Sequence, residues 1–277
     1  FDLEPLRDAL VGAGFRCATL GWDDPAADFS SARMTVLRST WNYPRVADAF
    51  RGWIHETSAV SCLLNPSDLV HWNIHKGYLL ELAAAGVPIA PTELVEQGSD
   101  RTLLEVAQSR GWRELVVKPA VSASSMATLK VGGEEFDLGE AHLRQLAAER
   151  DVLVQEFLSS VDGYGERALV WIDGELTHAV RKSPRFTGED EVTSTEAVEI
   201  SAPESSLAER AMAHVIRSFD EPPLYARIDV APGSNGEPVV MELELIEPSL
   251  YFSRSDRALN RMVGAIGSRL EELPEAD

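Results

Sequence analysis

Hydrophobic positions recur at helical and strand spacings along the chain, which predicts alternating helices and strands. Residues 3–15 place leucines at helical spacing and stop at Gly14, so they predict a helix. The stretches that follow predict short strands at 16–22, 34–40 and 61–66, and a helix at 46–57. This order is that of an α/β unit, and we expect its first strand to precede Phe1.

The rest of the chain continues the alternation. A helix is predicted from His71 to Gly86, where the glycine is a stop signal. The later predicted elements are strand 87–92, helix 102–111, strands 114–120 and 126–131, helix 141–151, strand 152–158, a hairpin over 166–183 that turns at Asp173 and Gly174, helix 206–219, strands 225–231 and 238–247, and helix 255–273. The polar stretch 183–196 predicts a mobile loop.

The predicted strand 238–247 crowds carboxylates onto a segment that is otherwise apolar. Strand alternation directs Glu242 and Glu244 to one face, and Met241, Leu243 and Leu245 to the other. Like charges about 7 Å apart on one face repel unless a cation lies between them. Two interpretations follow: a solvated face of an antiparallel or edge strand, or a Mg²⁺ site whose coordination is completed by phosphate and water.

The composition is that of an ordinary globular protein with a strong negative charge. The 277 residues are 44% hydrophobic, and 45 acidic against 25 basic residues give a net charge of −20. This charge argues against a nucleic-acid or membrane partner, so a phosphate site must rely on local cations, backbone amides and a metal. No apolar run approaches the ~18 residues of a membrane span, and no secretory signal is visible. Cys17 and Cys62 are interpreted as buried thiols of a reducing compartment, which predicts a cytoplasmic protein.

Three lysines accompany the acidic strand. Lys118 lies in an apolar strand and therefore requires a carboxylate or a phosphate as its counter-ion. The small residues after it, 121–128, favour either a loop that closes over phosphate oxygens or an ordinary hairpin loop. Lys76, taken alone, fits a solvated surface lysine on a helix, and Lys182 ends a strand.

Two arginines border predicted strands. Arg227 shares a strand face with Asp229, an arrangement that a structural ion pair explains equally well. Arg38 follows an apolar strand, at the edge where open α/β sheets bind ligands, so it is a candidate clamp for a substrate carboxylate. The neighbouring loop residues expected to contact the substrate with it are Ser39, Thr40, Trp41 and Asn42. The alternative is that Arg38 caps a neighbouring helix while Trp41 serves packing.

The whole series resembles the ATP-grasp superfamily of glutathione synthetase-like ligases. The shared series is a helix lysine (Lys76), a strand lysine followed by a small-residue loop (Lys118), the stretch "VQEF", a third lysine (Lys182), and then Arg-x-Asp and Glu-x-Glu on successive strands. The resemblance implies an ATP-grasp fold of mixed α/β and α+β class, in which an N-terminal α/β domain precedes two α+β subdomains that clamp ATP. The implied domains are 1–72 for substrate binding, 73–156 for the central lid and 157–277 for the subdomain with the metal site.

Residue by residue, the resemblance implies a site for ATP and Mg²⁺. The implied nucleotide contacts are Lys76, Lys118, Ser122, Ser124, Ser125, Gln155, Glu156, Phe157, Leu158, Glu166 and Lys182. The implied ligands of one or two Mg²⁺ ions are Asp229, Glu242 and Glu244. The implied catalytic cations are Lys118, Lys182 and Arg227, and the further substrate contacts are Glu247 and Ser253. Glu244 stands where many members have Asn, and the 122–128 loop lacks the glycines usual in the family.

A narrower resemblance relates the chain to the O-ureido-serine cyclo-ligase branch, which forms the antibiotic cycloserine. The segments that carry this resemblance are 38–44, 63–92, 116–125 and 242–252. It implies transfer of the ATP γ-phosphate to a small-molecule carboxylate, which gives an acyl phosphate that a nitrogen of the same molecule attacks. Such a reaction needs no protein nucleophile, in keeping with the absence of a G-x-S-x-G motif.

The sequence leaves other functions open. An ATP-grasp enzyme also joins two separate substrates in peptide or amino-acid ligation, or transfers a phosphoryl group as a kinase does. A non-catalytic nucleotide-binding module ranks last, because Asp229, Glu242 and Glu244 are all present. Self-association of the chain is equally left open.

Overall fold

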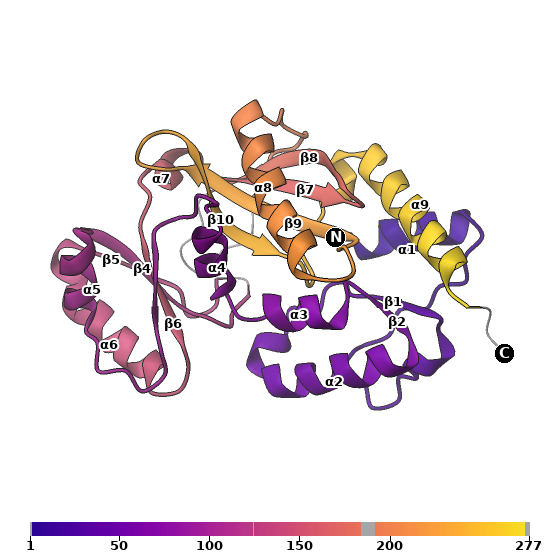
Figure 1. The fold of residues 1–277 in the computed structure, drawn as a ribbon, viewed down its shortest axis with the longest axis horizontal. Helices are drawn as coiled ribbons and strands as arrows, with labels where there is room; N and C mark the ends of the chain where they lie inside the picture. Colours follow the sequence, from indigo (N-terminus) through magenta and orange to yellow (C-terminus); the bar gives the residue numbers. More distant parts are fainter. Residues whose placement is uncertain (1, 124, 184–191, 275–277) are drawn as a thin grey trace.

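The described residues form three β-sheets, each with its own helices. The computed structural model describes residues 2–123, 125–183 and 192–274. The first sheet pairs β1 (Met34–Val36) with β2 (Cys62–Leu64). The central sheet contains, in spatial order, β3 (Thr92–Val95), β6 (Val152–Glu156), β4 (Glu114–Pro119) and β5 (Leu129–Gly132). The C-terminal sheet contains, in spatial order, β10 (Pro238–Glu244), β9 (Tyr225–Pro232), β7 (Glu166–Ile172) and β8 (Glu175–Lys182) (Figure 1). The first sheet is parallel and the other two are antiparallel. This mixture of α/β and α+β units confirms the predicted fold class.

The first unit consists of the β1–β2 pair and the helices that connect and cover it. Helix α2 (Ala47–Val60) crosses from β1 to β2 and buries Phe50 completely. Helix α1 (Leu3–Gly12) packs on the last helix, α9 (Asp256–Glu272), so helices near the two ends of the chain lie side by side (Figure 1). The strand predicted at 16–22 is wrong, because residues 16–21 are exposed and no strand among the described residues pairs with them. Both cysteines are free thiols, but Cys17 is exposed rather than buried.

The helix predicted from His71 to Gly86 is two short helices. Helix α3 (Ser67–Asn73) and helix α4 (Tyr78–Ala84) are separated by a turn that contains Lys76. The Asn73 side chain donates to the carbonyl of Leu243 and accepts from the amide of Leu245, each at 2.8 Å. The Lys76 amide donates to the carbonyl of Ala120 at 2.8 Å. These long-range bonds hold the turn against β10 and the end of β4, and so place Lys76 between two sheets.

The central sheet presents one face to its helices and the other to a cavity. Helices α5 (Leu103–Arg110) and α6 (Phe136–Ala147) cover the first face, where Leu115 and Val117 of β4 are buried with them. The alternate residues Val116 and Lys118 line the cavity instead. Strand alternation therefore explains how a lysine in an apolar strand reaches a polar site.

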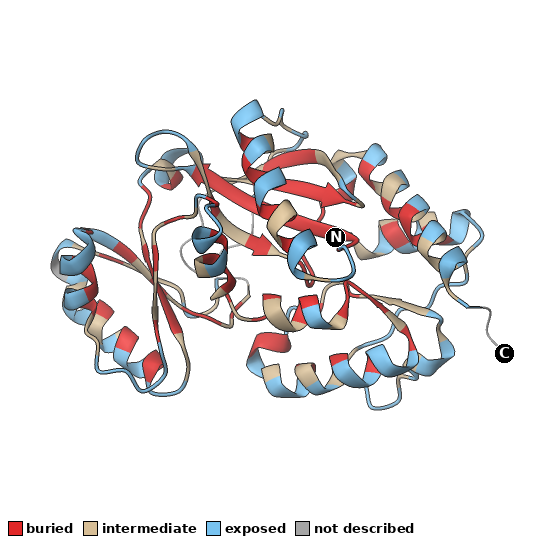
Figure 2. Ribbon diagram, in the orientation of Figure 1, coloured by how far each residue is buried: buried red, intermediate tan, exposed pale blue. Residues whose placement is uncertain are grey.

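The C-terminal sheet is covered on one face by α4 and α8 (Ala202–Ser218), and it contributes most of the buried strand residues in Figure 2. Its β7–β8 hairpin turns at Asp173 and Gly174, as predicted, and both residues have positive φ angles. The predicted loop 183–196 falls largely outside the described residues. Helices α7 (Ser160–Tyr164) and α9 complete this part of the chain.

A β-bulge changes the predicted alternation of β10. The pairing of β10 with β9 shifts register between Val240 and Glu242. Val240, Leu243 and Leu245 are consequently buried in one core, whereas Met241 packs against a separate cluster that contains Leu158 and Val161. The prediction that Met241 shares a face with Leu243 is therefore wrong, because one extra residue reverses the alternation. Glu242 and Glu244 still reach the same cavity.

Within residues 2–123, 125–183 and 192–274, every helix is too short or too polar to cross a membrane.

Candidate active site

A cavity of about 890 Å³ lies between the central and C-terminal sheets. Polar side chains from both sheets and from the first unit converge on it. The predicted site residues that line it are Trp41, Lys76, Lys118, Ser122, Ser125, Gln155, Glu156, Phe157, Leu158, Glu166, Lys182, Arg227, Asp229, Glu242, Glu244, Glu247 and Ser253. The predicted contact Ser124 lies outside the described residues. The fold thus brings together side chains that are separated by up to about two hundred positions in the sequence.

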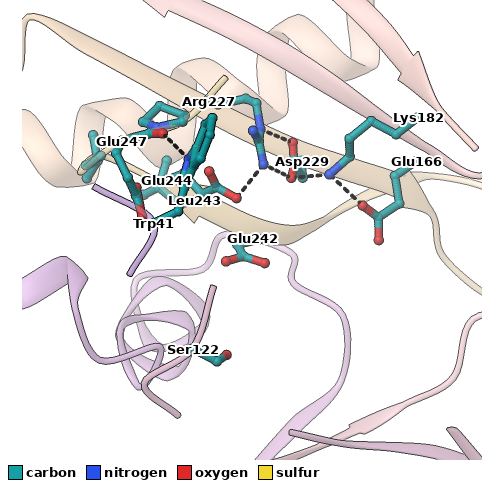
Figure 3. Close-up of polar contacts among 12 residues, drawn as sticks. Trp41, Ser122, Glu166, Lys182, Arg227, Asp229, Glu242, Leu243, Glu244 and Glu247 are labelled. Carbon is teal, nitrogen blue, oxygen red and sulfur yellow. Dashed lines mark hydrogen bonds and ion pairs between the residues drawn. The ribbon is translucent and has the colours of Figure 1, made fainter. Parts of the chain in front are cut away.

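The acidic side chains of β9 and β10 form a row of ion pairs with cations. Lys182 Nζ lies 2.5 Å from Asp229 Oδ2 and 3.0 Å from Glu166 Oε2 (Figure 3). Arg227 donates to both oxygens of Asp229, at 2.9 Å each, and also pairs with Glu244. The register of the two strands explains this row, because Glu244 lies opposite Arg227. The structural ion pair considered for Arg227 and Asp229 is therefore present.

Glu242 lines the cavity and interacts with two lysines of other elements. Lys76 Nζ lies 2.9 Å from Glu242 Oε1 and also donates to the Ser122 carbonyl at 2.5 Å. Burial alone would raise the pKa of Glu242, but Lys76 and Lys118 outweigh it and hold the pKa below its ordinary value. Asp229 is similar: burial opposes ionisation, and the charges of Arg227 and Lys182 lower its pKa nonetheless.

Two other carboxyls carry the excess negative charge of the cavity. Burial and the neighbouring carboxylates Glu242 and Asp229 raise the pKa of Glu244 from 4.5 to about 8, despite its pairing with Arg227. Burial raises the pKa of Glu247 to about 7. In the described part of the chain, the Glu247 carboxylate has no ion-pair partner within 4 Å, although three nearby cations, Lys76, Arg227 and Arg38, partly offset its burial. The site therefore holds more negative charge than its cations neutralise.

The three predicted metal ligands fit Mg²⁺ in chemistry but are paired with cations. Asp229, Glu242 and Glu244 offer carboxylate oxygens, which are the donors that Mg²⁺ prefers. The raised pKa of Glu244 shows that a further positive charge would be favourable here. Among residues 2–123, 125–183 and 192–274, no three His, Cys, Asp or Glu side chains already lie close enough to enclose an ion. Binding of Mg²⁺ would accordingly require these carboxylates to exchange lysine and arginine partners for the metal.

The raised pKa of Glu244 predicts that removal of its charge stabilises the ligand-free protein. A carboxyl whose folded pKa exceeds its unfolded pKa releases a proton on unfolding, so the free energy of unfolding falls as pH rises between the two values, here 4.5 and about 8. With chelator present, Glu244→Gln should gain stability over the wild type as pH rises from 5 to 8. Urea denaturation at both pH values measures this, with Glu237→Gln at an exposed position as the control. A stability difference that shrinks as pH rises would contradict the account.

Lys118 is a cation of the cavity that is available to a ligand. No carboxylate among the described residues lies within 4 Å of its ammonium group. Burial, together with Lys76 and Lys182, lowers the pKa of Lys118, and Glu242 and Glu166 only partly compensate. A half-buried ammonium group without an ion-pair partner favours an incoming anion such as phosphate.

The small-residue loop after Lys118 bends without glycine. Ser125 and Ala127 have φ angles of 57° and 52°, in the left-handed region that non-glycine residues seldom adopt. Ser122 and Ser125 line the cavity. The predicted hinge, residues 155–158 at the end of β6, also lines it. The Gln155 side chain already has a partner, because its amide donates to Thr92 Oγ1 at 2.8 Å.

Four predicted substrate contacts do not line the cavity: Arg38, Ser39, Thr40 and Asn42. Arg38 Nη2 donates to the Pro248 carbonyl at 2.7 Å and lies 3.4 Å from Asp2, so it holds backbone rather than facing the cavity. Asn42 bonds to Trp22 and Asp23. The predicted carboxylate clamp at Arg38 is therefore not formed, and of this loop only Trp41 and Tyr43 border the cavity among the described residues.

Several cavity residues were absent from the predicted site. They include Asp2, Tyr43, Asn73 and Tyr78. Tyr43 lies inside a stretch that the sequence marks, "RSTWNYP". Asp2 has no such signal, because its partners lie about 250 residues away in the chain.

Comparisons with known proteins agree on one kind of protein over the whole chain. A family model described as the N-terminal domain of D-cycloserine synthetase DcsG matches residues 1–65. The cycloserine biosynthesis protein DcsG of Streptomyces lavendulae is 30% identical over 282 residues, which cover 98% of this chain and 94% of that protein. The crystal structure of D-cycloserine synthetase DcsG has a TM-score of 0.89 at 31% identity, covering 97% of this chain and 94% of that one.

More distant solved structures share the fold alone. The ATP-grasp ligase PsnB, in a complex with Mg, ADP and a phosphomimetic variant of its minimal precursor, has a TM-score of 0.68 at 18% identity and covers 97% of this chain and 95% of that one. The D-alanine–D-alanine ligase of Bacillus anthracis, complexed with ATP, has a TM-score of 0.59 at 17% identity, over 81% of this chain and 76% of that one.

Proposed function

The chain belongs to the DcsG family of ATP-grasp ligases, ADP-forming enzymes that make carbon–nitrogen bonds, and we propose that it cyclises O-ureido-D-serine to D-cycloserine. The observation that carries the proposal is the single cavity in which Lys118, a cation without an ion-pair partner within the described residues, faces an over-charged set of carboxylates. Triphosphate would supply the negative charge that Lys118 lacks as a partner, and Mg²⁺ would supply positive charge to the carboxylates. Similarity to DcsG supports the choice of substrate.

In the proposed complex, the nucleotide lies between the two four-stranded sheets. The proposed nucleotide contacts are Lys76, Lys118, Ser122, Ser125, the hinge residues Gln155, Glu156, Phe157 and Leu158, and Glu166 and Lys182, all of which line the cavity. Ser124, which the resemblance also implies, remains part of this proposal. The proposed Mg²⁺ ligands are Asp229, Glu242 and Glu244, and one or two bound ions would supply neutralisation of the phosphate charge.

The proposed reaction has three steps. A carboxylate oxygen of the substrate attacks the γ-phosphorus of ATP, ADP leaves, and an acyl phosphate forms. Lys182 and Arg227, which hold Asp229 in the ligand-free protein, are positioned to neutralise the transferred phosphoryl group. In the second step, the oxygen-bound ureido nitrogen of the same molecule attacks the acyl carbon, displaces phosphate and closes the ring. In the third step, water removes the carbamoyl group from this nitrogen as carbon dioxide and ammonia, which leaves D-cycloserine.

Glu247 is the proposed acceptor of the proton that the attacking nitrogen loses. Its carboxylate lines the cavity and has no ion-pair partner within 4 Å in the described residues, so it is available to a substrate group. Its pKa of about 7 suits a general base that works near neutral pH. Trp41 and Ser253, which also line the cavity, are the proposed substrate contacts beside it.

An ADP-release assay tests the proposal against ligation of two substrates. The protein is incubated with ATP and Mg²⁺, first with single acids that include O-ureido-D-serine, then with pairs of an amino acid and a second amine. We expect ADP with O-ureido-D-serine alone, together with a product of the mass of cycloserine. ADP that forms only when a second amine is present would replace cyclisation with ligation. Bound nucleotide without ADP release under any condition would indicate a non-catalytic module.

A further inference from the structure

The loop after β10 is held by side chains of the first unit. This acceptor loop, residues 247–254, contributes Glu247, Ser249, Tyr251, Ser253 and Arg254 to the cavity wall. Trp41 Nε1 donates to the Glu247 carbonyl at 3.3 Å, a contact drawn in Figure 3. Arg38 Nη2 donates to the next carbonyl, that of Pro248, at 2.7 Å. Two consecutive carbonyls of the loop are thus fixed by residues more than 200 positions earlier in the chain.

The same loop is held on its amide side by one carboxylate. Asp2, which lies at the start of α1, accepts hydrogen bonds from three consecutive backbone amides. The Leu250 and Tyr251 amides donate to Oδ2, the latter at 3.0 Å, and the Phe252 amide donates to Oδ1 at 3.0 Å. Arg38 lies 3.4 Å from Oδ2, and the side chains of Asp2 and Arg38 are only 11% and 5% exposed. Such shielded, charge-assisted bonds are among the stronger polar contacts in proteins.

The convergence of three amides on one carboxylate requires a bent backbone. Tyr251 has a φ angle of 49°, in the left-handed region that aromatic residues seldom adopt. Successive amides that point into one concavity form an anion-binding nest, and a carboxylate in the nest favours the bend. A short 3₁₀ turn, Phe252–Arg254, begins directly after it. The Asp2 carboxylate therefore stabilises the backbone that sets where Tyr251, Ser253 and Arg254 meet the cavity.

We propose that Asp2, held in place by Arg38, is a positioning residue that shapes the acceptor end of the cavity and so sets affinity for the carboxylate substrate. The acceptor end is the part bordered by Trp41 and the acceptor loop. This inference rests on the proposed function, because the loop next to Glu247 is where the substrate would lie. It also gives Arg38 a role, since the Arg38 side chain does not reach the cavity but holds Asp2, the residue that shapes its acceptor end.

The position of Asp2 predicts a selective effect on one substrate. Apart from Arg38, every group that hydrogen-bonds to the Asp2 carboxylate among the described residues belongs to the acceptor loop, whereas Lys76, Lys118 and the hinge belong to other elements. Loss of the anchor should therefore weaken binding of O-ureido-D-serine and leave binding of ATP nearly unchanged. Small misplacements of positioning groups typically change rates by about tenfold to a hundredfold.

The test combines hydrogen exchange of the loop with steady-state kinetics. Asp2→Ala removes the anchor, Asp2→Asn keeps an oxygen acceptor for the amides, and Asp8→Ala removes a charge from the same helix at an exposed position. Amide exchange of a peptide covering 247–254 is measured by mass spectrometry without substrate. KM for O-ureido-D-serine, KM for ATP and kcat are then measured from ADP release.

We expect faster loop exchange in Asp2→Ala, a KM for O-ureido-D-serine raised about tenfold or more, and a KM for ATP within about twofold of the wild type. Asp2→Asn should recover part of both effects, and Asp8→Ala should show neither. Unchanged loop exchange in Asp2→Ala would overturn the inference, whether or not the wild type is active. A wild-type protein that turned over no acid would defeat only the proposed function. Faster exchange with equal rises in both KM values, or with a lower kcat alone, would overturn the inference as well.

Discussion

Replacement of Glu242 by alanine is expected to reduce ADP release by a factor on the order of 10² to 10³, because one of the groups that organises charge around the phosphates is lost. In the ligand-free protein, Glu242 pairs with Lys76 and also lowers the charge repulsion between Lys76 and Lys118. Its removal deletes a proposed Mg²⁺ ligand and leaves two lysines unbalanced. The measurement is the rate of ADP formation at saturating ATP, Mg²⁺ and O-ureido-D-serine.

The matched control for this variant is Glu237→Ala. Glu237 is exposed and directly precedes β10. Its replacement by alanine therefore removes the same charge from the same part of the chain without altering the cavity. It should retain the wild-type rate, and circular dichroism should show both variants folded. A folded Glu242→Ala protein that releases ADP within about threefold of the wild type would remove Glu242 from the site.

Replacement of Lys118 by methionine is expected to weaken nucleotide binding by about tenfold to a hundredfold while leaving the ligand-free protein at least as stable as the wild type. Hydrogen bonds to charged groups contribute about 1.5–3 kcal/mol, which corresponds to this loss of affinity. The lowered pKa of Lys118 shows that its charge is unfavourable in the empty cavity, so an apolar side chain of similar length relieves that cost. Calorimetric titration with a non-hydrolysable ATP analogue and Mg²⁺ gives the affinity, and urea denaturation gives the stability.

Arg113→Met is the control for the lysine variant. Arg113 is exposed and directly precedes β4, the strand that carries Lys118. Its replacement should change neither nucleotide affinity nor stability appreciably. If Lys118→Met were strongly destabilised and still bound the nucleotide normally, Lys118 would have to be assigned a structural role.

Replacement of this lysine is expected to weaken function without weakening stability, because of how the charges are arranged in the cavity. Three of the cations proposed to hold phosphate, Lys76, Lys182 and Arg227, are paired with the carboxylates proposed to hold Mg²⁺. Glu244 and Glu247 remain in excess: burial raises the pKa of both, and repulsion from neighbouring carboxylates raises that of Glu244 further. A structure selected for stability alone would not gather these charges, so the energetic disadvantage itself indicates a ligand site.

The sequence could predict the charged residues of the cavity because strand alternation is local. Lys118 in an apolar strand and Glu242 with Glu244 on one face each follow from a few neighbouring residues, and all three line the cavity. The α/β start and the hairpin over 166–183 are predictable for the same reason. The spacing of apolar residues is determined by which face of each element is buried.

The sequence could not predict the features that depend on distant contacts. The break between α3 and α4 depends on Asn73, whose side chain bonds to backbone about 170 positions away. The position of Arg38 depends on Asp2 and Pro248, which only the folded chain brings together. The bulge that redirects Met241 arises from the pairing of β10 with β9, and no residue pattern within β10 marks it.

Transfer of isotope from the substrate carboxylate to phosphate tests the central claim most directly. O-Ureido-D-serine labelled with ¹⁸O in its carboxylate is incubated with the protein, ATP and Mg²⁺, and the released phosphate is analysed by mass spectrometry. Activation through an acyl phosphate predicts that each phosphate released with product carries one ¹⁸O atom, because the bridging oxygen leaves with phosphorus. Product formed together with unlabelled phosphate would contradict carboxylate activation and, with it, the function proposed for this cavity.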